Sequence, residues 1–258
     1  MTSKRIGLTL SGGGARGIAH LGVIKAFEEH GVSFDILSGT SAGAIIGAMY
    51  SYGYSVNEIL KIILDLKAFK FISPAMSTKG LLKMDVIRRF LESYFPENSF
   101  DKLKIPLSIA ATHIRTGTTK YFEDGDLINI ICASSCIPVL FQPVMLEGEL
   151  YIDGGILNNL PTEIIRDRCD VLIGSHSNPI DRNFEVKNAR FVLERALMLS
   201  ITRNASESAK LCDIFIEPQG LEPFKVMDLN KAKEIFGMGY KAAIKLIEEQ
   251  KLIEKIGI

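Results

Sequence analysis

The chain has 258 residues, and 47% of them are hydrophobic, which is enough for the core of one large α/β domain or two small ones. Its 30 basic and 30 acidic residues cancel to a formal net charge of zero without any block of Lys or Arg, which argues against a general attraction to nucleic acid. No hydrophobic signal-peptide segment follows Met1–Arg5, and no run of about 18 apolar residues indicates a membrane-spanning helix.

Strand-like and helix-like segments alternate along the chain, which predicts a parallel sheet covered by helices. In chain order we expect strand 6–10, helix 17–29, strand 34–38, helices 42–52, 56–66 and 84–94, strands 106–112 and 118–122, helix 127–136, a hairpin over 144–152, strand 171–174, helix 191–211, strand 214–216 and helix 229–253. No repeat, low-complexity tract or linker interrupts this order, so the expected organisation is a single domain over residues 1–258.

The four cysteines, at positions 132, 136, 169 and 212, include no C-x-x-C pair. Without a signal segment, this favours reduced thiols and a cytoplasmic location. Cys132 and Cys136 could share one side of a helix as a metal pair, but no set of His or Cys partners accompanies them, so we expect core thiols. Asp124 and Asp126 lack the other ligands of a calcium loop, and no metal requirement is expected.

Ser41 lies in the sequence Gly39-Thr40-Ser41-Ala42-Gly43, between a predicted strand and a predicted helix. A serine on such a sharp, glycine-flanked turn is typical of a nucleophile elbow, where a strained backbone projects the hydroxyl into a cleft at the positive end of the helix dipole. The three fixed positions also recur by chance, and Thr40 or Ser41 could instead cap the helix without any chemistry. Both interpretations remain open for this segment alone.

A glycine-rich loop, Gly12-Gly13-Gly14-Ala15-Arg16-Gly17, joins the first strand to the first helix. Glycines let the backbone approach a ligand and turn its N–H groups inward, so the loop predicts a site for a phosphate or a transient oxyanion. It also matches the dinucleotide pattern G-x-G-x-x-G, which requires an acidic residue at the end of the second strand. Here Asp35 lies near the start of that strand and Ser41 follows its end, so we disfavour a nucleotide ligand.

Asp153 follows the predicted strand segment 150–152 and precedes Gly154 and Gly155. An aspartate beside two glycines is often only a turn former. Its carboxylate could also take the proton of the Ser41 hydroxyl, which is a weak nucleophile until a base acts on it. Ser41, Asp153 and the amides of the glycine loop would then supply the nucleophile, the base and the oxyanion donors of one reaction.

These three motifs, in this order, resemble those of the patatin-like phospholipase family, whose members carry a G-G-G-x-R/K-G loop, a G-x-S-x-G elbow and a D-G-G/A motif. The similarity also covers Ala133–Pro138, Phe141–Pro143 and Asp153–Pro161, and it continues more loosely at Gly239–Ala243. The resemblance is to the single-domain members of bacterial type. It implies a three-layer α/β/α fold with a central, mostly parallel sheet.

By this resemblance, Ser41 is the nucleophile and Asp153 is the base of a dyad without histidine. Gly39 and Gly43 belong to the elbow, and the oxyanion hole is formed by the loop residues Gly12, Gly13, Gly14, Ala15, Arg16 and Gly17. We expect the Arg16 side chain to hold this loop through a salt bridge rather than to orient an anionic head group.

The activity that the resemblance implies is a serine acyl hydrolase that cleaves fatty-acyl esters of phospholipids or other lipids through an acyl-enzyme, without metal or cofactor. The implied partner is the acyl-ester substrate, with transient contact at a membrane surface as an expectation and with no nucleic acid. The oligomeric state stays open. The alternative, a binding protein instead of an enzyme, is a scaffold that keeps the fold but hydrolyses nothing.

Most serine hydrolases use a histidine base, and the chain has four histidines, at positions 20, 30, 113 and 176. His176 follows a predicted strand and completes the chain order Ser41, Asp153, His176 of α/β-hydrolase triads. Those enzymes place the elbow deeper in the sheet, whereas here it follows the second strand, so we prefer the dyad. His20 is expected to pack or hydrogen-bond near the glycine loop.

Residues 67–76 mix aromatic and basic side chains after an apolar helix. A flap or a membrane-contacting edge is one interpretation. Packing of Phe69, Phe71 and Ile72 in the core is the other, and we favour it.

Overall fold

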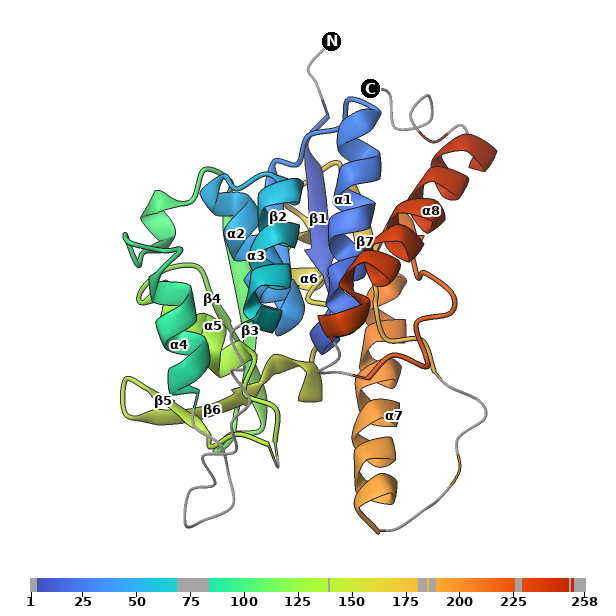
Figure 1. Ribbon diagram of the computed structural model, residues 1–258. Helices are drawn as coiled ribbons and strands as arrows, with labels where there is room; N and C mark the ends of the chain where they lie inside the picture. The colour runs from blue at the N-terminus through green and yellow to red at the C-terminus, as the bar shows by residue number, and fades with distance from the viewer. Residues whose placement is uncertain are drawn as a thin grey trace.

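The structure is a computed structural model that describes residues 4–68, 84–138, 140–180, 185, 189–225, 229–250 and 252. These residues form an eight-stranded sheet with helices on both faces (Figure 1). The strand order is β5-β6-β3-β2-β1-β7-β8, with β4 paired to β3. The strands from β3 to β8 along this order are parallel, and β4, β5 and β6 add antiparallel pairs. This confirms the expected α/β/α architecture with a mostly parallel sheet.

The bounds of the elements are as follows. The strands are β1 (Ile6–Leu10), β2 (Ile36–Thr40), β3 (Leu107–His113), β4 (Thr118–Phe122), β5 (Val144–Leu146), β6 (Glu149–Asp153), β7 (Val171–Ser175) and β8 (Ile214–Ile216). The α-helices are α1 (Ala19–Glu29), α2 (Ala42–Tyr52), α3 (Val56–Ala68), α4 (Asp85–Glu92), α5 (Leu127–Ser134), α6 (Glu163–Arg166), α7 (Ala189–Ala209) and α8 (Ala232–Gln250). The short 3-10 segments in the described part of the chain are η1 (Gly14–Ile18), η2 (Phe100–Lys102), η3 (Gly154–Ile156) and η4 (Leu229–Lys231).

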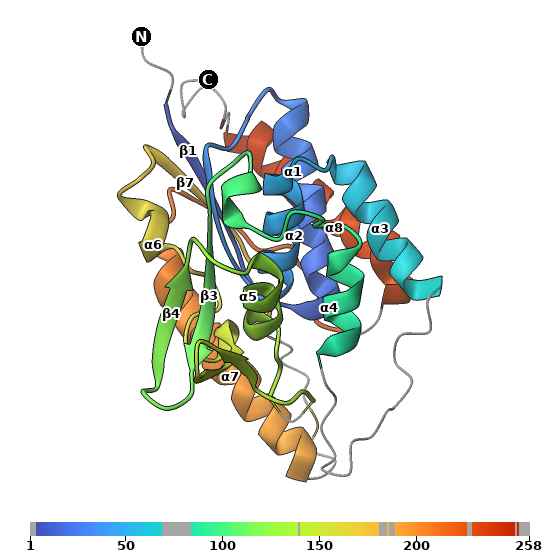
Figure 2. The same ribbon diagram turned by 90° about the vertical axis from the view of Figure 1, so that its left-hand side faces the viewer.

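The central strands β1, β2 and β7 are buried along their whole length, as expected for parallel strands covered on both faces. Helices α1 to α5 and α8 cover one face, and α6 and α7 lie on the other (Figure 2). The large apolar core lies under the first group of helices. A small cluster of Ile36, Ile165 and Leu172 packs under α6.

Helix α8 packs across α1 rather than directly on the sheet (Figure 1). Two glycines make this close approach possible. A Cβ atom on Gly22 would lie 2.1 Å from the carbonyl oxygen of Phe236, and one on Gly239 would lie 2.0 Å from that of Ala19. Among the described residues, no helix is both long and apolar enough to cross a membrane.

Besides shifts of a few residues at the ends of several elements, three details differ from the sequence predictions. The first helix begins at Ala19 instead of Gly17, because residues 14–18 form the tighter turn η1. The second strand begins at Ile36, so Asp35 precedes it, and an oxygen of its carboxylate accepts a hydrogen bond from the Ile6 amide at 2.7 Å. Helix α6 was not predicted. The predicted flap or core segment at 67–76 lies, from Phe69 onward, outside the described residues.

Candidate active site

The ends of β2 and β6 meet on one edge of β3. Thr40 pairs with Ala110 in a parallel ladder, and Asp153 pairs with the next residue, Ala111, in an antiparallel ladder. Because β4 occupies the opposite edge of β3, β2 and β6 run toward each other along the first edge. Ser41, which follows Thr40, is therefore brought next to Asp153 although the two are far apart in sequence.

Ser41 joins β2 to α2 in a strained conformation, with φ at 53° and ψ at −119°. A positive φ is costly for a residue with a Cβ atom and persists only where the surroundings enforce it. The flanking glycines allow this turn: a Cβ on Gly39 would lie 2.6 Å from the carbonyl oxygen of Gly43, and one on Gly43 would lie 2.3 Å from that of Leu10. Glycine at position 39 thus lets the start of α2 fold back onto the end of β2, and glycine at position 43 lets it approach the end of β1.

The Ser41 hydroxyl faces the Asp153 carboxylate and lowers the pKa of that group. It makes no capping bond to the amides of α2, so the capping interpretation is wrong. Asp153 Oδ1 also accepts the amide of Gly155 at 2.8 Å, so its role in the turn and its contact with Ser41 coexist. Ser41 is 6% exposed and Asp153 is 7% exposed.

Burial raises the pKa of Asp153 from 3.8 to about 6, against the opposing effect of the hydrogen bonds from Ser41 and Gly155. The carboxyl is therefore ionised at neutral pH, yet it is a stronger base than an exposed aspartate. A general base is most effective when its pKa lies near the working pH.

Ser134, at the end of α5, supports the elbow and was not singled out from the sequence. Its Oγ accepts the Ser41 amide at 2.8 Å and donates to the Ala110 carbonyl at 2.7 Å. The side chain thereby ties the strained residue to β3. In the sequence, Ser134 is a small polar residue at the end of a mostly apolar helix, within the segment 133–138 that resembles the family.

The glycine loop lies against the elbow, since a Cβ on Gly12 would be 3.2 Å from the Cβ of Ser41. The Gly12 amide is committed to Asn159, at 3.2 Å from the backbone oxygen and 3.1 Å from Oδ1. The Arg16 amide donates to the Gly13 carbonyl at 3.2 Å. Among the described residues, the amides of Gly13 and Gly14 meet no hydrogen-bond acceptor, so these loop donors remain available.

Other residues of the loop anchor it. Arg16 Nε donates to the Phe224 carbonyl at 2.7 Å, and Nη2 donates to the Glu222 carbonyl at 2.9 Å. Its side chain thus holds the loop to the segment before α8. A Cβ on Gly17 would lie 2.6 Å from the Cβ of Ala42, so this glycine permits contact between η1 and α2. Ala15 is buried.

The histidines take other partners. His176 is buried, and its Nδ1 lies 2.8 Å from Glu217 Oε2, a contact that lowers the pKa of the Glu217 carboxyl. His20 Nε2 lies 2.9 Å from the Ser11 carbonyl and therefore donates to it, which leaves Nδ1 to accept from Ser175 Oγ at 2.7 Å. Burial lowers the pKa of His20 to about 4, so its ring is neutral at physiological pH. No histidine in the described part of the chain bonds to the Ser41–Asp153 pair.

No cluster of three or more His, Cys, Asp or Glu side chains that could hold a metal lies within the described ranges. Cys132 and Cys136 are free thiols in the core, and burial raises their pKa values to about 11 and about 12. Asp126 caps α5, with Oδ1 accepting the Asn129 amide at 2.9 Å.

Comparison with known proteins places this site in a family. The family model described as patatin-like phospholipase matches residues 8–166, which include the glycine loop, the elbow and Asp153. The chain belongs to the patatin-like phospholipase family. The resemblance inferred from the three motifs is thereby confirmed.

Patatin-like relatives are found in distant organisms. Human patatin-like phospholipase domain-containing protein 6 is 27% identical over 93% of this chain. An uncharacterized NTE family protein of Mycobacterium tuberculosis is 33% identical over 62% of this chain. The chain spans 20% of the length of the first relative and 45% of the second. The crystal structure of VipD from Legionella pneumophila shares the fold with a TM-score of 0.55 at 16% identity, over 96% of this chain and 67% of that one.

Proposed function

We propose that this patatin-like protein is a serine acyl hydrolase that cleaves fatty-acyl esters of phospholipids or related lipids. The observation that carries the proposal is that the strand register along β3 brings Ser41, on its strained elbow, to the buried Asp153 carboxylate, whose pKa the Ser41 hydroxyl lowers. The glycine loop touches Ser41 at Gly12, and its free Gly13 and Gly14 amides are suitable donors for an oxyanion.

In the first half of the proposed reaction, Ser41 Oγ attacks the acyl carbonyl carbon while its proton passes to Asp153. The carbonyl oxygen becomes an oxyanion that accepts hydrogen bonds from the Gly13 and Gly14 amides. The intermediate then collapses, the carbon–oxygen bond to the alcohol breaks, and the departing alkoxide takes the proton from Asp153. The products are an acyl-enzyme on Ser41 and a free alcohol or lysolipid.

In the second half, water attacks the acyl-enzyme and gives a proton to Asp153. A second oxyanion forms in the same hole and collapses, and Ser41 Oγ leaves with the proton from Asp153. The fatty acid is released and the dyad returns to its starting state. No group outside the dyad, the hole and water takes part, so we propose that neither a metal nor a cofactor is required.

A carboxylate can replace histidine here because of burial. The pKa of Asp153, about 6, approaches the ordinary value of about 6.5 for histidine. Its basicity toward the Ser41 proton is therefore close to that of an imidazole. The hydrogen bond from the Gly155 amide keeps the carboxylate oriented beside the Ser41 hydroxyl without neutralising it.

The lipid substrate is supported by the relatives. The human relative is named a phospholipase domain-containing protein, and a relative from Lodderomyces elongisporus, 24% identical over 96% of this chain, is named a lysophospholipase. Three apolar side chains on the antiparallel edge that carries Asp153 are exposed: Ile114 by 42%, Met145 by 66% and Leu150 by 40%. We propose that this edge makes transient contact with a membrane surface and that the protein acts from the cytoplasm.

The test uses a soluble p-nitrophenyl ester, a fluorescent phospholipid and a fluorophosphonate probe that labels activated serines. Wild type should be labelled at Ser41 and should hydrolyse both substrates, and addition of EDTA should change neither rate. Ser41→Ala and Asp153→Asn should lose activity. Ser51→Ala is the matched control, because Ser51 is also a buried serine of the elbow–α2 segment and its Oγ meets no hydrogen-bond partner among the described residues.

Loss of activity in Ser41→Ala and Asp153→Asn, with Ser51→Ala and His176→Ala active, supports the dyad. Loss in a folded His176→Ala variant contradicts it and favours a triad. A wild type that is neither labelled nor active overturns the hydrolase proposal and favours the scaffold. Hydrolysis of the ester but of no phospholipid would reject the lipid substrate alone. For the membrane contact, Met145→Ser and Leu150→Ser should weaken binding to phosphatidylcholine vesicles without slowing hydrolysis of the soluble ester.

A further inference from the structure

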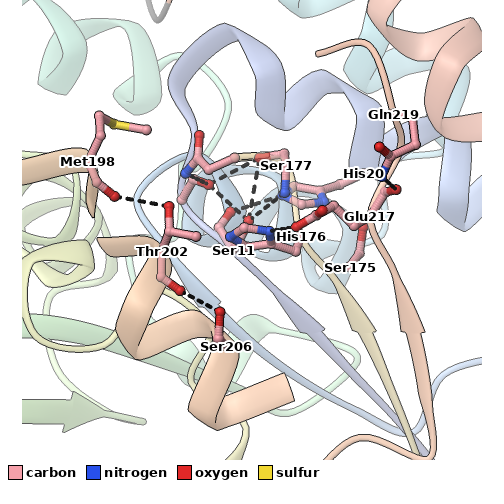
Figure 3. A network of polar contacts seen from close by, with 12 residues as sticks. Ser11, His20, Ser175, His176, Ser177, Met198, Thr202, Ser206, Glu217 and Gln219 are labelled. Atoms are coloured by element: carbon pink, nitrogen blue, oxygen red, sulfur yellow. Dashed lines mark hydrogen bonds and ion pairs between the residues drawn. The ribbon is translucent and has the colours of Figure 1, made fainter. Parts of the chain in front are cut away.

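The carbonyl oxygen of Gly12 is held by three donors. Ser11 Oγ donates to it at 2.9 Å, Ser177 Oγ at 3.0 Å and Asn178 Nδ2 at 2.8 Å. All three side chains are buried, and Ser11 and Ser177 are seen in this network in Figure 3. A carbonyl oxygen has two lone pairs, so one or two hydrogen bonds are enough for a buried carbonyl, and this one receives three. The arrangement fixes the orientation of this peptide group.

The orientation matters because the same peptide group carries the amide of Gly13. In a trans peptide the C=O and the following N–H point in opposite directions, and no cis peptide occurs among the described residues. Ser177 and Asn178 follow β7, and the sheet order places β1 between β7 and β2. A Gly12 carbonyl held from the β7 side therefore aims the Gly13 amide toward the β2 side, where Ser41 lies.

The preceding peptide group is locked as well. Its carbonyl, on Ser11, accepts from His20 Nε2 at 2.9 Å, and its amide, on Gly12, donates to Asn159. Ser177 is also tied to the Ser11 side chain, because its amide donates to Ser11 Oγ at 2.9 Å. Both ends of the Ser11–Gly12 peptide are thus committed, whereas the Gly12–Gly13 peptide has its carbonyl committed and its amide open.

We propose that Asn178 and Ser177 are positioning residues for the oxyanion hole: they hold the Gly12 carbonyl so that the Gly13 amide points at the oxyanion formed on Ser41. This rests on the function proposed above. Hydrogen bonds to the carbonyl also polarise the peptide and make its amide a stronger donor. Neither side chain touches the reacting atoms, and neither belongs to the three motifs of the family.

The test compares Asn178→Leu, Ser177→Ala and the double variant with wild type. Leucine keeps the branched shape of asparagine but has no donor, and Gly12 retains two hydrogen bonds after either single change, so the fold should tolerate each one. Thr162→Ala is the matched control, since Thr162 is also buried and its Oγ1 donates to a backbone carbonyl, that of Ser208, at 3.2 Å.

The readouts are kcat and KM for a soluble ester, Ki for a trifluoromethyl ketone whose adduct with Ser41 carries an oxyanion, and Tm. We expect kcat to fall about tenfold in each single variant, which is less than the roughly 100-fold or greater loss caused by removing an oxyanion-hole donor itself. In the double variant kcat should fall about 100-fold, close to that loss. KM should stay within about twofold, and Ki should rise in parallel with the fall in kcat/KM. Thr162→Ala should lower Tm without this kinetic signature.

Two results overturn the positioning role. One is a kcat that stays at the wild-type level in folded Asn178→Leu and Ser177→Ala variants. The other is a loss of activity that follows the loss of Tm in all variants, Thr162→Ala included. If wild type hydrolyses nothing and Ser41 is not labelled, the hydrolase proposal fails and this one fails with it. An active wild type with an inactive Ser41→Ala and unaffected Asn178 and Ser177 variants rejects the positioning role alone.

Discussion

Relative to wild type, the Asp153→Asn variant should gain unfolding free energy as the pH rises from acidic to neutral. Burial raises the pKa of this carboxyl from 3.8 to about 6, so the folded state binds its proton more tightly than the unfolded state does. The carboxyl therefore contributes stability that is fully present below pH 3.8 and is lost as the pH rises through about 6. Asn has the same shape and no charge, so the variant lacks this dependence.

The magnitude follows from the shift. A difference of about 2 pKa units corresponds to about 3 kcal/mol of unfolding free energy, of which about 2 kcal/mol is lost between about pH 4.5 and about pH 7.5. The other titrating groups are common to both proteins and cancel when the variant is compared with wild type. The difference in unfolding free energy, variant minus wild type, should thus rise by about 2 kcal/mol over this range and then stay level.

Urea unfolding of both proteins across this pH range measures the difference directly. A second comparison starts from Ser41→Ala. Loss of the Ser41 hydrogen bond removes an influence that lowers the pKa of Asp153, so the rise should occur at higher pH in that background. A difference that stays constant within about 0.5 kcal/mol would refute the reasoning, because Asp153 would then titrate alike in the folded and unfolded states.

Four further outcomes are expected. With a soluble ester, kcat/KM should fall about tenfold per pH unit below an apparent pKa of about 6, since protonated Asp153 cannot accept the hydroxyl proton; a pH-independent rate would contradict this. His176→Ala should keep kcat/KM within about twofold of wild type in the same assay. Ser134→Ala should lower the unfolding free energy by about 1–3 kcal/mol and reduce kcat, because the elbow amide loses its acceptor; urea unfolding and kinetics check both effects. Gly43→Ala should fail to fold, because its Cβ would lie 2.3 Å from a carbonyl oxygen. Its control is Gly237→Ala on α8, whose Cβ would meet no described atom within 4 Å and whose unfolding free energy, measured with urea, should rise by about 0.5–1 kcal/mol.

The helices and strands were largely predictable because their signals are local. The run Ile6–Leu10 and the segment Ala42–Tyr52 have the bounds that apolar runs and flanking glycines indicate. The hairpin turn at Glu147 and Gly148 was equally clear, and both residues have the positive φ that a two-residue turn of this kind needs. The prediction was wrong at the start of α1, where contacts of the glycine loop with other segments favour a 3-10 turn.

The sequence by itself determined the identity of the chemical groups: a serine on a glycine-flanked turn, an aspartate beside two glycines, and a loop rich in glycine. It could not decide whether the Ser41 hydroxyl caps its helix or faces Asp153. That choice depends on the register of two strands along β3, where Ala110 and Ala111 bring the two residues together. Strand register between distant segments is a property of the whole sheet.

The electrostatics and the support of the site were also decided by the tertiary structure alone. Burial by surrounding segments raises the pKa of Asp153, and no pattern near that residue in the sequence reveals its burial. His176, which matched the chain order of a triad, bonds to Glu217 instead. The loop after β7 reaches the Gly12 carbonyl through Asn178, because β7 is the neighbour of β1 in the sheet although it lies far along the chain. Local patterns specify which groups are present, and packing between distant segments decides which of them meet.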